Sequence, residues 1–211
     1  MTRLPGGGIY AITDCENFDR HEFLVKTDSI LRAGAVMLQY RDKGTDIDER
    51  LSMADKTYQL CKQYNVPLII NDDPELALEI DADGVHIGKA DATYDKARKL
   101  LGQDRIIGIS CYNDIERAIV AERMGVDYVA FGSFFPSVTK ADAVRADLTL
   151  LKQAKKKLNL PIVAIGGITP ENGRQLVESG ADFLAVISGL YSSVDSYKAT
   201  QAYLELFNNN D

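Results

Sequence analysis

The sequence predicts an α/β protein built as a (β/α)₈ TIM barrel. A short apolar run followed by a longer segment of helical period recurs eight times, and no hairpin signal interrupts the alternation. Glycine or another small residue leads from several helical segments into the next run, as a helix C-cap turn does. This pattern favours parallel strands joined by helices. A doubly wound open sheet would also suit it, but the first run lacks the GxGxxG of a dinucleotide-binding version.

The apolar runs give the predicted strands, and the amphipathic segments between them give the helices. In chain order the runs are Ile9–Thr13, Ala35–Tyr40, Leu68–Ile70, Gly84–Ile87, Ile106–Ser110, Tyr128–Gly132, Ile162–Ile165 and Phe183–Ile187. The clearest helical segments are Asp46–Tyr64, Asn113–Met124, Leu148–Leu158 and Pro170–Ser179. No linker or low-complexity segment divides them, so residues 1–211 are expected to form a single compact domain.

Composition narrows the classes of partner. The formal net charge of -7 disfavours nucleic acid and anionic membranes, because no basic face is available to neutralise phosphates. No apolar run approaches the length of a membrane span or a signal peptide. The 3 cysteines are odd in number and lack CxxC spacing, which indicates neither a disulfide framework nor zinc. A cytoplasmic protein that binds small molecules is therefore expected, with its oligomeric state left open, a homo-oligomer included.

The third and fourth strands are expected to end in acids. In a barrel of this kind the active site lies at the carboxyl ends of the strands. Asn71 and Asp72 follow the third run, and Asp91 follows the fourth. Since Mg²⁺ takes carboxylate and phosphate oxygens, we interpret Asp72 and Asp91 as a magnesium site for a phosphorylated ligand. Asp73 before Pro74 fits a helix N-cap instead, and Asp91 taken alone would fit one as well.

The second strand end carries Gln39, Arg41 and Lys43. These residues share one side of an extended strand, so all three are expected to face the mouth of the barrel. Arginine offers a planar fork to phosphate oxygens, and lysine supplies a compact charge. A solvated cluster of charges at a strand end would explain the same residues equally well.

The fourth and fifth runs add His86 and Ser110. His86 lies within a strand, where a histidine is more often a hydrogen-bonded structural residue, so it is a weaker candidate for the pocket. Ser110 is placed to contact a phosphate, but no histidine follows it to act as its base. Cys111 is expected to be a small buried filler.

The last three strand ends suit phosphates. The loop after the sixth run sets Ser137, Thr139 and Lys140 behind a Phe-Phe-Pro segment, which suits closure over an anion with many acceptor oxygens. The seventh run ends in a Gly-Gly pair that includes Gly167, and the eighth ends at Ser188. Backbone amides after strands seven and eight commonly bind a phosphate in this fold. Together the strand ends indicate a Mg²⁺-assisted diphosphate site beside a metal-free monophosphate site, and a reaction in which diphosphate leaves.

The series IYAITD, LQYRDK, IINDD, DGVHIGKAD, GIS, GSFFPSVTK, AIGGI and AVIS resembles the thiamine-phosphate synthase (thiamine-phosphate diphosphorylase) family from about Ile9 to Ser188. The resemblance implies an enzyme that couples 4-amino-2-methyl-5-hydroxymethylpyrimidine diphosphate to a hydroxyethylthiazole phosphate, or its carboxy form. It implies that diphosphate leaves first, and that Asp72 and Asp91 hold Mg²⁺.

The resemblance also implies a role for each polar strand end. The residues it places on the pyrimidine diphosphate are Arg41, Lys43, Asn71, Ser110 and Lys140, with Gln39 beside the ring. Those it places on the thiazole phosphate side are Ser137, Thr139, Gly167, Ile187 and Ser188. The predicted catalytic residues are Lys140, Arg41, Lys43 and Ser110.

Two residues depart from the family pattern and bear on the alternatives to a synthase. Ser137 replaces the usual threonine but keeps the hydroxyl. Tyr112 stands where the family often has the histidine of Ser-x-His, and related barrels that tautomerise a thiazole phosphate use a histidine in that region. Tyr112 therefore disfavours a thiazole tautomerase-like paralogue. A catalytically silent barrel that binds thiamine precursors is disfavoured because Asp72, Asp91 and Lys140 are all present.

Overall fold

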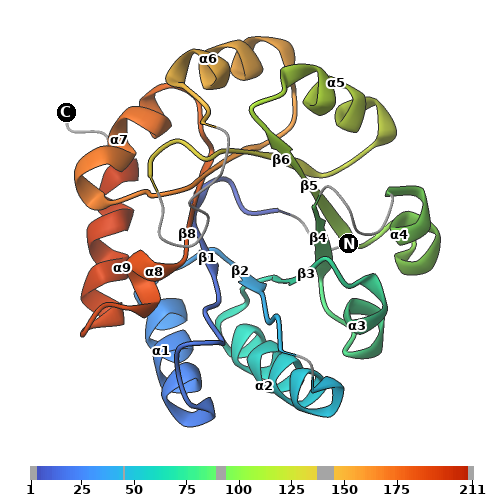
Figure 1. Cartoon of the computed structure of the whole chain (residues 1–211), viewed down its shortest axis with the longest axis vertical. Helices are drawn as coiled ribbons and strands as arrows, with labels where there is room; N and C mark the ends of the chain where they lie inside the picture. The colour runs from blue at the N-terminus through green and yellow to red at the C-terminus, as the bar shows by residue number, and fades with distance from the viewer. Residues whose placement is uncertain (1–3, 45, 89–93, 137–144, 209–211) are drawn as a thin grey trace.

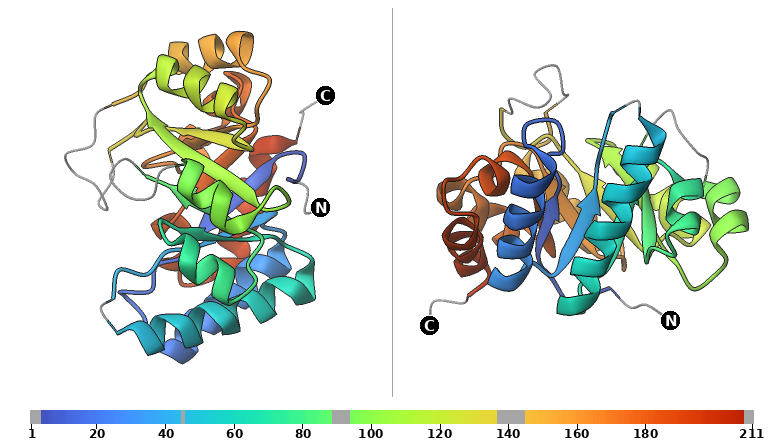
Figure 2. Two further views of the ribbon diagram at one scale, coloured as in Figure 1. Left: turned by 90° about the vertical axis from the view of Figure 1, so that its right-hand side faces the viewer. Right: turned by 90° about the horizontal axis from the view of Figure 1, so that it is seen from below.

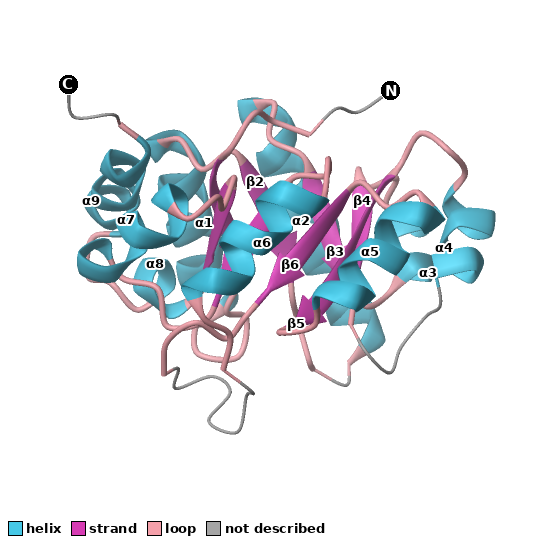
Figure 3. Cartoon of the chain, turned by 90° about the horizontal axis from the view of Figure 1, so that it is seen from above, coloured by secondary structure: helices cyan, strands magenta, loops and turns pink. Residues whose placement is uncertain are grey.

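The computed structural model describes residues 4–44, 46–88, 94–136 and 145–208. Its strands are all parallel and close into a barrel in the order β1-β2-β3-β4-β5-β6-β7-β8, with helices outside them (Figures 1 and 3). The predicted (β/α)₈ barrel is thus confirmed, and the open-sheet alternative is wrong. No helix among the described residues has both the length and the apolar character needed to cross a membrane.

The strands are short and the helices vary in length. The strands are β1 Gly8–Ile12, β2 Met37–Tyr40, β3 Leu68–Asn71, β4 Gly84–Ile87, β5 Ile106–Tyr112, β6 Tyr128–Phe131, β7 Ile162–Ile165 and β8 Phe183–Val186. The helices are α1 Arg20–Ala33, α2 Ile47–Tyr64, α3 Pro74–Glu79, α4 Tyr94–Leu101, α5 Ile115–Met124, α6 Leu148–Lys157, α7 Pro170–Glu178, α8 Ser188–Tyr191 and α9 Ser196–Leu204, followed by the 3₁₀ turn η1 Glu205–Phe207. In the views of Figures 1 and 2, α1 lies between α2 and α9.

Most predicted strand boundaries agree to within one residue, and the two that differ by two residues do so for identifiable reasons. β2 begins at Met37 rather than Ala35, because Ala35 still belongs to the turn that ends α1 and donates its amide to the Ile30 carbonyl at 3.3 Å. β5 continues to Tyr112, past the predicted end at Ser110, through an irregularity in its pairing with β6. An irregularity of this kind bends a strand, and here it begins at Ser110, a predicted site residue.

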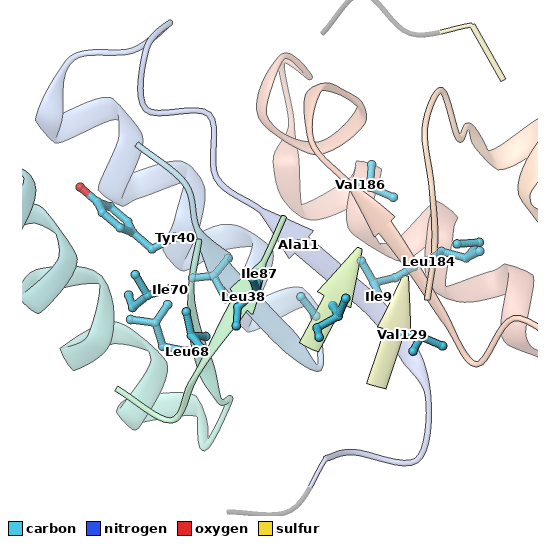
Figure 4. Close-up of a cluster of buried hydrophobic side chains, with 14 of the residues drawn as sticks. Ile9, Ala11, Leu38, Tyr40, Leu68, Ile70, Ile87, Val129, Leu184 and Val186 are labelled. Atoms are coloured by element: carbon cyan, nitrogen blue, oxygen red, sulfur yellow. The ribbon is translucent and has the colours of Figure 1, made fainter. Parts of the chain in front are cut away.

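Alternate residues of each strand face opposite sides of the barrel wall. Inward residues form a closed apolar core made of Tyr10, Ile12, Met37, Ile69, Ile106, Tyr128, Ala130, Val163, Phe183 and Ala185. Their neighbours point outward and pack under the helices, as Figure 4 shows for Ile9, Leu38, Ile70, Val129 and Leu184. Burial on both faces explains why the strands read as continuous apolar runs.

Aspartates join neighbouring strands at the amino end of the barrel. Asp83, Asp127 and Asp182 each come just before an even-numbered strand and accept the amide of a residue at the start of the preceding strand. The bonds are Leu68 N to Asp83 Oδ2 at 2.9 Å, Ile107 N to Asp127 Oδ2 at 2.7 Å and Ile162 N to Asp182 Oδ2 at 2.8 Å. We call these three residues the amino-end clamps.

Candidate active site at the carboxyl ends of the strands

Asp72 lies directly after β3 and is held by both neighbouring strand ends. Its amide donates to the His86 carbonyl at 2.8 Å, which extends the β3–β4 pairing by one bond. Its Oδ1 accepts the Gly88 amide at 2.8 Å, and its Oδ2 accepts the Asn71 side-chain amide at 2.7 Å. The residue has a φ of 61°, in the left-handed region that aspartate tolerates better than most residues. The carboxylate is therefore held in one orientation by its hydrogen bonds, on a backbone conformation that is uncommon outside glycine.

Lys43 completes this cluster from the loop after β2. Its Nζ lies 3.3 Å from Asp72 Oδ2, and its side chain is 50% exposed. An ion pair this exposed contributes little to stability. Lys43 can consequently leave the carboxylate and contact an anion without a large penalty.

A pocket of about 360 Å³ opens beside this cluster. Mainly charged and polar residues line it, from the loop after β2, the start of α2, the end of β3 and the start of α3, namely Asp42, Lys43, Gly44, Arg50, Asn71, Asp72, Asp73 and Glu75. Such a lining suits a charged, hydrated ligand better than an apolar one.

Asp73 is the N-cap of α3, as predicted, with Pro74 at the first helical position. Its Oδ1 accepts the Leu76 amide at 2.9 Å, and its Oδ2 lies 2.9 Å from Arg50 Nη2. Both oxygens of Asp73 are therefore engaged in structure. Both oxygens of Asp72 also accept hydrogen bonds, but its cation Lys43 is half-exposed and it caps no helix, so Asp72 is the candidate for a ligand.

The shared strand face expected for Arg41 and Lys43 assumed that the extended strand continues past the predicted run, and it does not. β2 ends at Tyr40, and both residues lie in the following loop. The buried hydroxyl of Thr13 shapes that loop, since it accepts the Arg41 amide at 2.8 Å and donates to the Arg41 carbonyl at 3.1 Å. Sequence reasoning missed Thr13, although it ends the first predicted strand and is the first polar residue after an apolar run.

The inward-facing polar residues form a continuous chain of hydrogen bonds through the barrel. Gln39 Nε2 lies 2.7 Å from the Tyr10 hydroxyl, which lies 2.9 Å from the Tyr128 hydroxyl. His86 Nδ1 is 2.9 Å from Tyr128, and its Nε2 is 2.8 Å from Ser110 Oγ. His86 is thus connected to a predicted site residue. The sequence indicated Gln39, His86 and Ser110 but not the two tyrosines between them.

The end of β5 is braced by an arginine that the sequence did not single out. Arg117 of α5 donates from Nε to the Ser110 carbonyl at 2.8 Å, and its guanidinium lies 5.8 Å from the centre of the Tyr112 ring. Cys111 is buried, as predicted, and burial raises the pKa of its thiol to about 12. Cys111 is consequently a packing residue and not a nucleophile at neutral pH.

The ends of β6 and β7 pack closely against each other. The Phe135 amide donates to the Gly166 carbonyl at 3.0 Å. Gly167 has a φ of 61°, and a Cβ placed there would lie 2.2 Å from the Pro136 carbonyl oxygen. The Gly-Gly pair is therefore needed for this contact, in addition to any role in binding phosphate.

The thiazole phosphate side is predicted to include Gly167, Ile187 and Ser188, and these residues follow adjacent strands. β7 pairs with β8 through Ile165 and Ala185, close to the ends of both strands. Ile187 is the N-cap of α8, and Ser188 begins that short helix. Both strand ends therefore reach the same rim of the barrel.

Four predicted site residues, Asp91, Ser137, Thr139 and Lys140, lie outside the described residues. The pairing of Asp72 with Asp91 and the role of the loop lysine accordingly stay predictions. Within the described ranges, no three His, Cys, Asp or Glu side chains gather as metal ligands.

Comparison with known proteins identifies the family. The model of the thiamine monophosphate synthase family matches residues 9–190. The chain belongs to this family. A thiamine-phosphate synthase of Nitrosococcus oceani is 52% identical over 95% of this chain and 92% of that protein. One from Nitrosomonas eutropha is 48% identical over 98% of this chain and 97% of that protein.

A solved structure agrees with this assignment. Thiamine phosphate pyrophosphorylase from Pyrococcus furiosus superposes with a TM-score of 0.85 at 32% identity, covering 94% of each chain. The family predicted from the strand-end motifs is therefore confirmed for nearly the whole barrel.

Proposed function

We propose that this member of the thiamine monophosphate synthase family joins 4-amino-2-methyl-5-hydroxymethylpyrimidine diphosphate to hydroxyethylthiazole phosphate, or its carboxy form. The products are thiamine phosphate and diphosphate. Relatives 52% and 48% identical over almost the full chain are thiamine-phosphate synthases. The observation that carries the proposal is the fixed Asp72 carboxylate with Lys43 and Asn71 beside it, in a polar pocket at the carboxyl ends of the strands.

The reaction breaks one bond and forms another. The bond between the pyrimidine methylene carbon and the diphosphate oxygen breaks, and its electron pair leaves with diphosphate. The lone pair of the thiazole nitrogen then forms the new C–N bond, which makes that nitrogen a thiazolium. No proton has to be removed from the nucleophile, which agrees with the lack of a predicted general base.

Lys43 and Arg41 are proposed to bind the diphosphate and to stabilise its growing charge as it departs. Ser110 and Asn71 offer further polar contacts, and Lys140 is proposed to act on the same group. Gly167, Ile187 and Ser188, with Ser137 and Thr139, are proposed to hold the thiazole phosphate through amides and hydroxyls. These assignments place the leaving group on strands two to six, and the nucleophile on strands seven and eight together with the two hydroxyl residues that follow strand six in the sequence.

The donor set around Asp72 fits Mg²⁺. A carboxylate is a hard oxygen ligand, and Mg²⁺ is typically bound by one or two carboxylates together with substrate phosphates. Asp72 Oδ2 already faces a cation, the Lys43 ammonium at 3.3 Å. Asp72 and Asp91 are proposed to hold the ion, which when bound would neutralise charge on the diphosphate.

The tautomerase-like alternative gains no support from the end of β5. Tyr112 occupies the position where a histidine would be needed, and its ring lies near the guanidinium of Arg117. A phenol in contact with a cation does not replace an imidazole as an acid and base at neutral pH.

Release of diphosphate tests the proposal. The purified protein is mixed with both substrates and Mg²⁺, and diphosphate and thiamine phosphate are measured together. We expect equal amounts of the two products. Absence of both products across varied metal and salt conditions would instead favour a silent binding protein.

The loop lysine has its own test. Lys140→Ala should lower kcat strongly and leave the affinity for thiazole phosphate almost unchanged. Equal losses in both quantities would show that Lys140 does not act on the diphosphate.

A further inference from the structure

The inward-facing chain of Gln39, Tyr10, Tyr128, His86 and Ser110 links two predicted site residues across an otherwise apolar core. Gln39 and Ser110 are its ends, contributed by β2 and β5. The residues between them are almost fully buried, with Tyr10 at 1%, Tyr128 at 0% and His86 at 8% exposure. Buried polar groups carry a large penalty unless they are hydrogen-bonded, so such a chain needs every member to be satisfied.

The fold makes room for this chain at a specific position. A Cβ added to Gly108 of β5 would lie 1.9 Å from Cζ of Tyr128. The Tyr128 ring therefore fits inside the barrel only because residue 108 is glycine. The Tyr10 and Tyr128 rings meet edge to face at 5.9 Å, and the His86 ring stacks on Tyr128 at 5.6 Å. The hydroxyls and the imidazole are thus held by ring packing as well as by hydrogen bonds.

Counting protons gives the chain a direction. Gln39 Nε2 donates to Tyr10, so the Tyr10 hydroxyl uses its own proton toward Tyr128. Tyr128 then donates to His86 Nδ1, which leaves the proton of a neutral imidazole on Nε2 for Ser110 Oγ. The Ser110 hydroxyl proton and the Gln39 Oε1 are what the chain leaves for a ligand.

Burial keeps both phenols protonated, as this direction requires. It raises the pKa of Tyr10 above its usual range, and it raises the pKa of Tyr128 in the same way. The reverse direction would require the Gln39 amide to turn so that Oε1 replaces Nε2 at the Tyr10 hydroxyl, because the amide nitrogen cannot accept that proton.

We propose that Tyr10 and Tyr128 are positioning residues that fix the tautomer of His86, so that Ser110 acts as a hydrogen-bond donor and Gln39 as an acceptor toward the substrate. The ligand side of this inference rests on the proposed function. There Ser110 would donate to the departing diphosphate, and Gln39 would accept from the amino group of the pyrimidine. The tyrosines touch neither group and act only through the chain.

Nitrogen NMR of the histidine side chains tests the direction without any need for turnover. The polypeptide contains 2 histidines, and the exposed His21 of α1 serves as an internal reference. We expect His86 to be the neutral tautomer protonated at Nε2 in the wild type, and to lose that preference in Tyr128→Phe. Tyr10→Phe is the second variant, should Tyr128→Phe fail to fold. Unchanged His86 signals in a folded variant would overturn the proposal.

Tyr191→Phe is the matched control. Tyr191 is also fully buried and its hydroxyl lies 2.9 Å from that of Thr27, but it belongs to α8 outside the barrel interior. Its loss should leave the His86 signals and kcat unchanged. A similar change in this control would show that the tyrosine effect is general loss of packing, and this would also overturn the proposal.

Kinetics then tests the link to Ser110. Tyr128→Phe should lower kcat by roughly three- to tenfold, the usual worth of one hydrogen bond, with little change in KM. In a Ser110→Ala background the same substitution should have almost no further effect, because the chain no longer has a donor to orient. Additive losses would overturn the proposal. If the wild type makes no thiamine phosphate but His86 still depends on Tyr128, the proposed function fails while the direction of the chain stands.

Discussion

Aspartates at the two ends of the barrel are used in different ways. At the amino end, the carboxylates of the clamps Asp83, Asp127 and Asp182 accept amides of the preceding strands at 2.7 to 2.9 Å. At the carboxyl end, Asp72 accepts amides too, but it does so from left-handed backbone and with a half-exposed lysine as its cation. One end uses carboxylates to join strands, and the other holds the carboxylate that we propose binds a ligand.

The cations beside Asp127 and Asp72 differ in how far they are exposed. Arg98 beside Asp127 is 9% exposed and also donates to the carbonyls of Gly102 and Arg105, so it is committed to structure. Lys43 beside Asp72 is 50% exposed and has room to move. Exposure of the cation alone does not separate the two ends, because the clamp Asp182 pairs with Lys155, which is 52% exposed. What differs is the place of the carboxylate, at the amino end or at the carboxyl end of the strands. Substitutions at the two ends should therefore affect different measured quantities.

The largest effect is expected for Asp72→Asn. Asparagine tolerates the left-handed backbone and keeps the shape, so the free energy of unfolding should change by less than about 1 kcal/mol. The lost charge should lower kcat by on the order of a hundredfold, since charge stabilisation at such a site is worth several kcal/mol. Diphosphate release and thermal unfolding measure the two effects. Full activity in the variant would remove Asp72 from the proposed metal site.

Asp127→Ala should produce the opposite result. It leaves the Ile107 amide without its acceptor and the buried Arg98 without its carboxylate, which should cost about 2–3 kcal/mol of stability. The kcat of the folded fraction should stay within about twofold of the wild type, because the clamp lies at the other end of the strands. Urea unfolding and kinetics on one preparation decide the case. A large loss of kcat at full stability would break the distinction between the two ends.

Gly167→Ala should sharpen the comparison within the carboxyl end. The new methyl group would meet the Pro136 carbonyl, and the backbone φ of 61° is unfavourable for alanine. We expect a loss of about 1–3 kcal/mol in stability together with a higher KM for thiazole phosphate. The KM for the pyrimidine diphosphate serves as the control and should change less. Equal increases in both KM values would contradict the division into two anion sites.

The smallest effect is expected from alkylation of thiols. Burial raises the pKa of Cys15 and of Cys111 to about 12, so both remain thiols rather than thiolates near pH 8. Because the thiolate is the reactive form, iodoacetamide should leave activity unchanged at that pH. Mass spectrometry of the treated protein checks the extent of modification. Rapid inactivation with one modified cysteine would show a reactive thiol at the site.

The sequence predicted the fold, and it offered candidate site residues, because both follow from local pattern. Alternating apolar runs indicated the strands, and the Asn-Asp-Asp-Pro segment separated the capping Asp73 from Asp72. What the sequence could not show depends on closure of the barrel. Tyr10 and Tyr128 are far apart in the chain, and their hydroxyls meet only when β1 and β6 face the same interior. Arg117 likewise reaches Ser110 only through the docking of α5.

The course of the chain after β2 is the second feature that the sequence did not predict. The parity expected for Arg41 and Lys43 assumed a continuing strand, whereas the Thr13 hydroxyl bends the chain after Tyr40. Thr13, just after the neighbouring strand β1, makes these hydrogen bonds to Arg41, and no pattern within residues 35–43 indicates them. The predicted end of β2 at Tyr40 is confirmed, and what the sequence did not show is the tertiary contact that holds the following loop.

The seam of the barrel has a consequence for how the protein is made. β1 pairs with β8, through partners such as Gly8 and Phe183. The first strand of the barrel to be synthesised therefore has no partner on that edge until the last strand has been made. Until then β1 has an unpaired edge of the kind that promotes association between chains. Ribosome-bound chains that stop short of β8 should therefore be the most dependent on chaperones during synthesis.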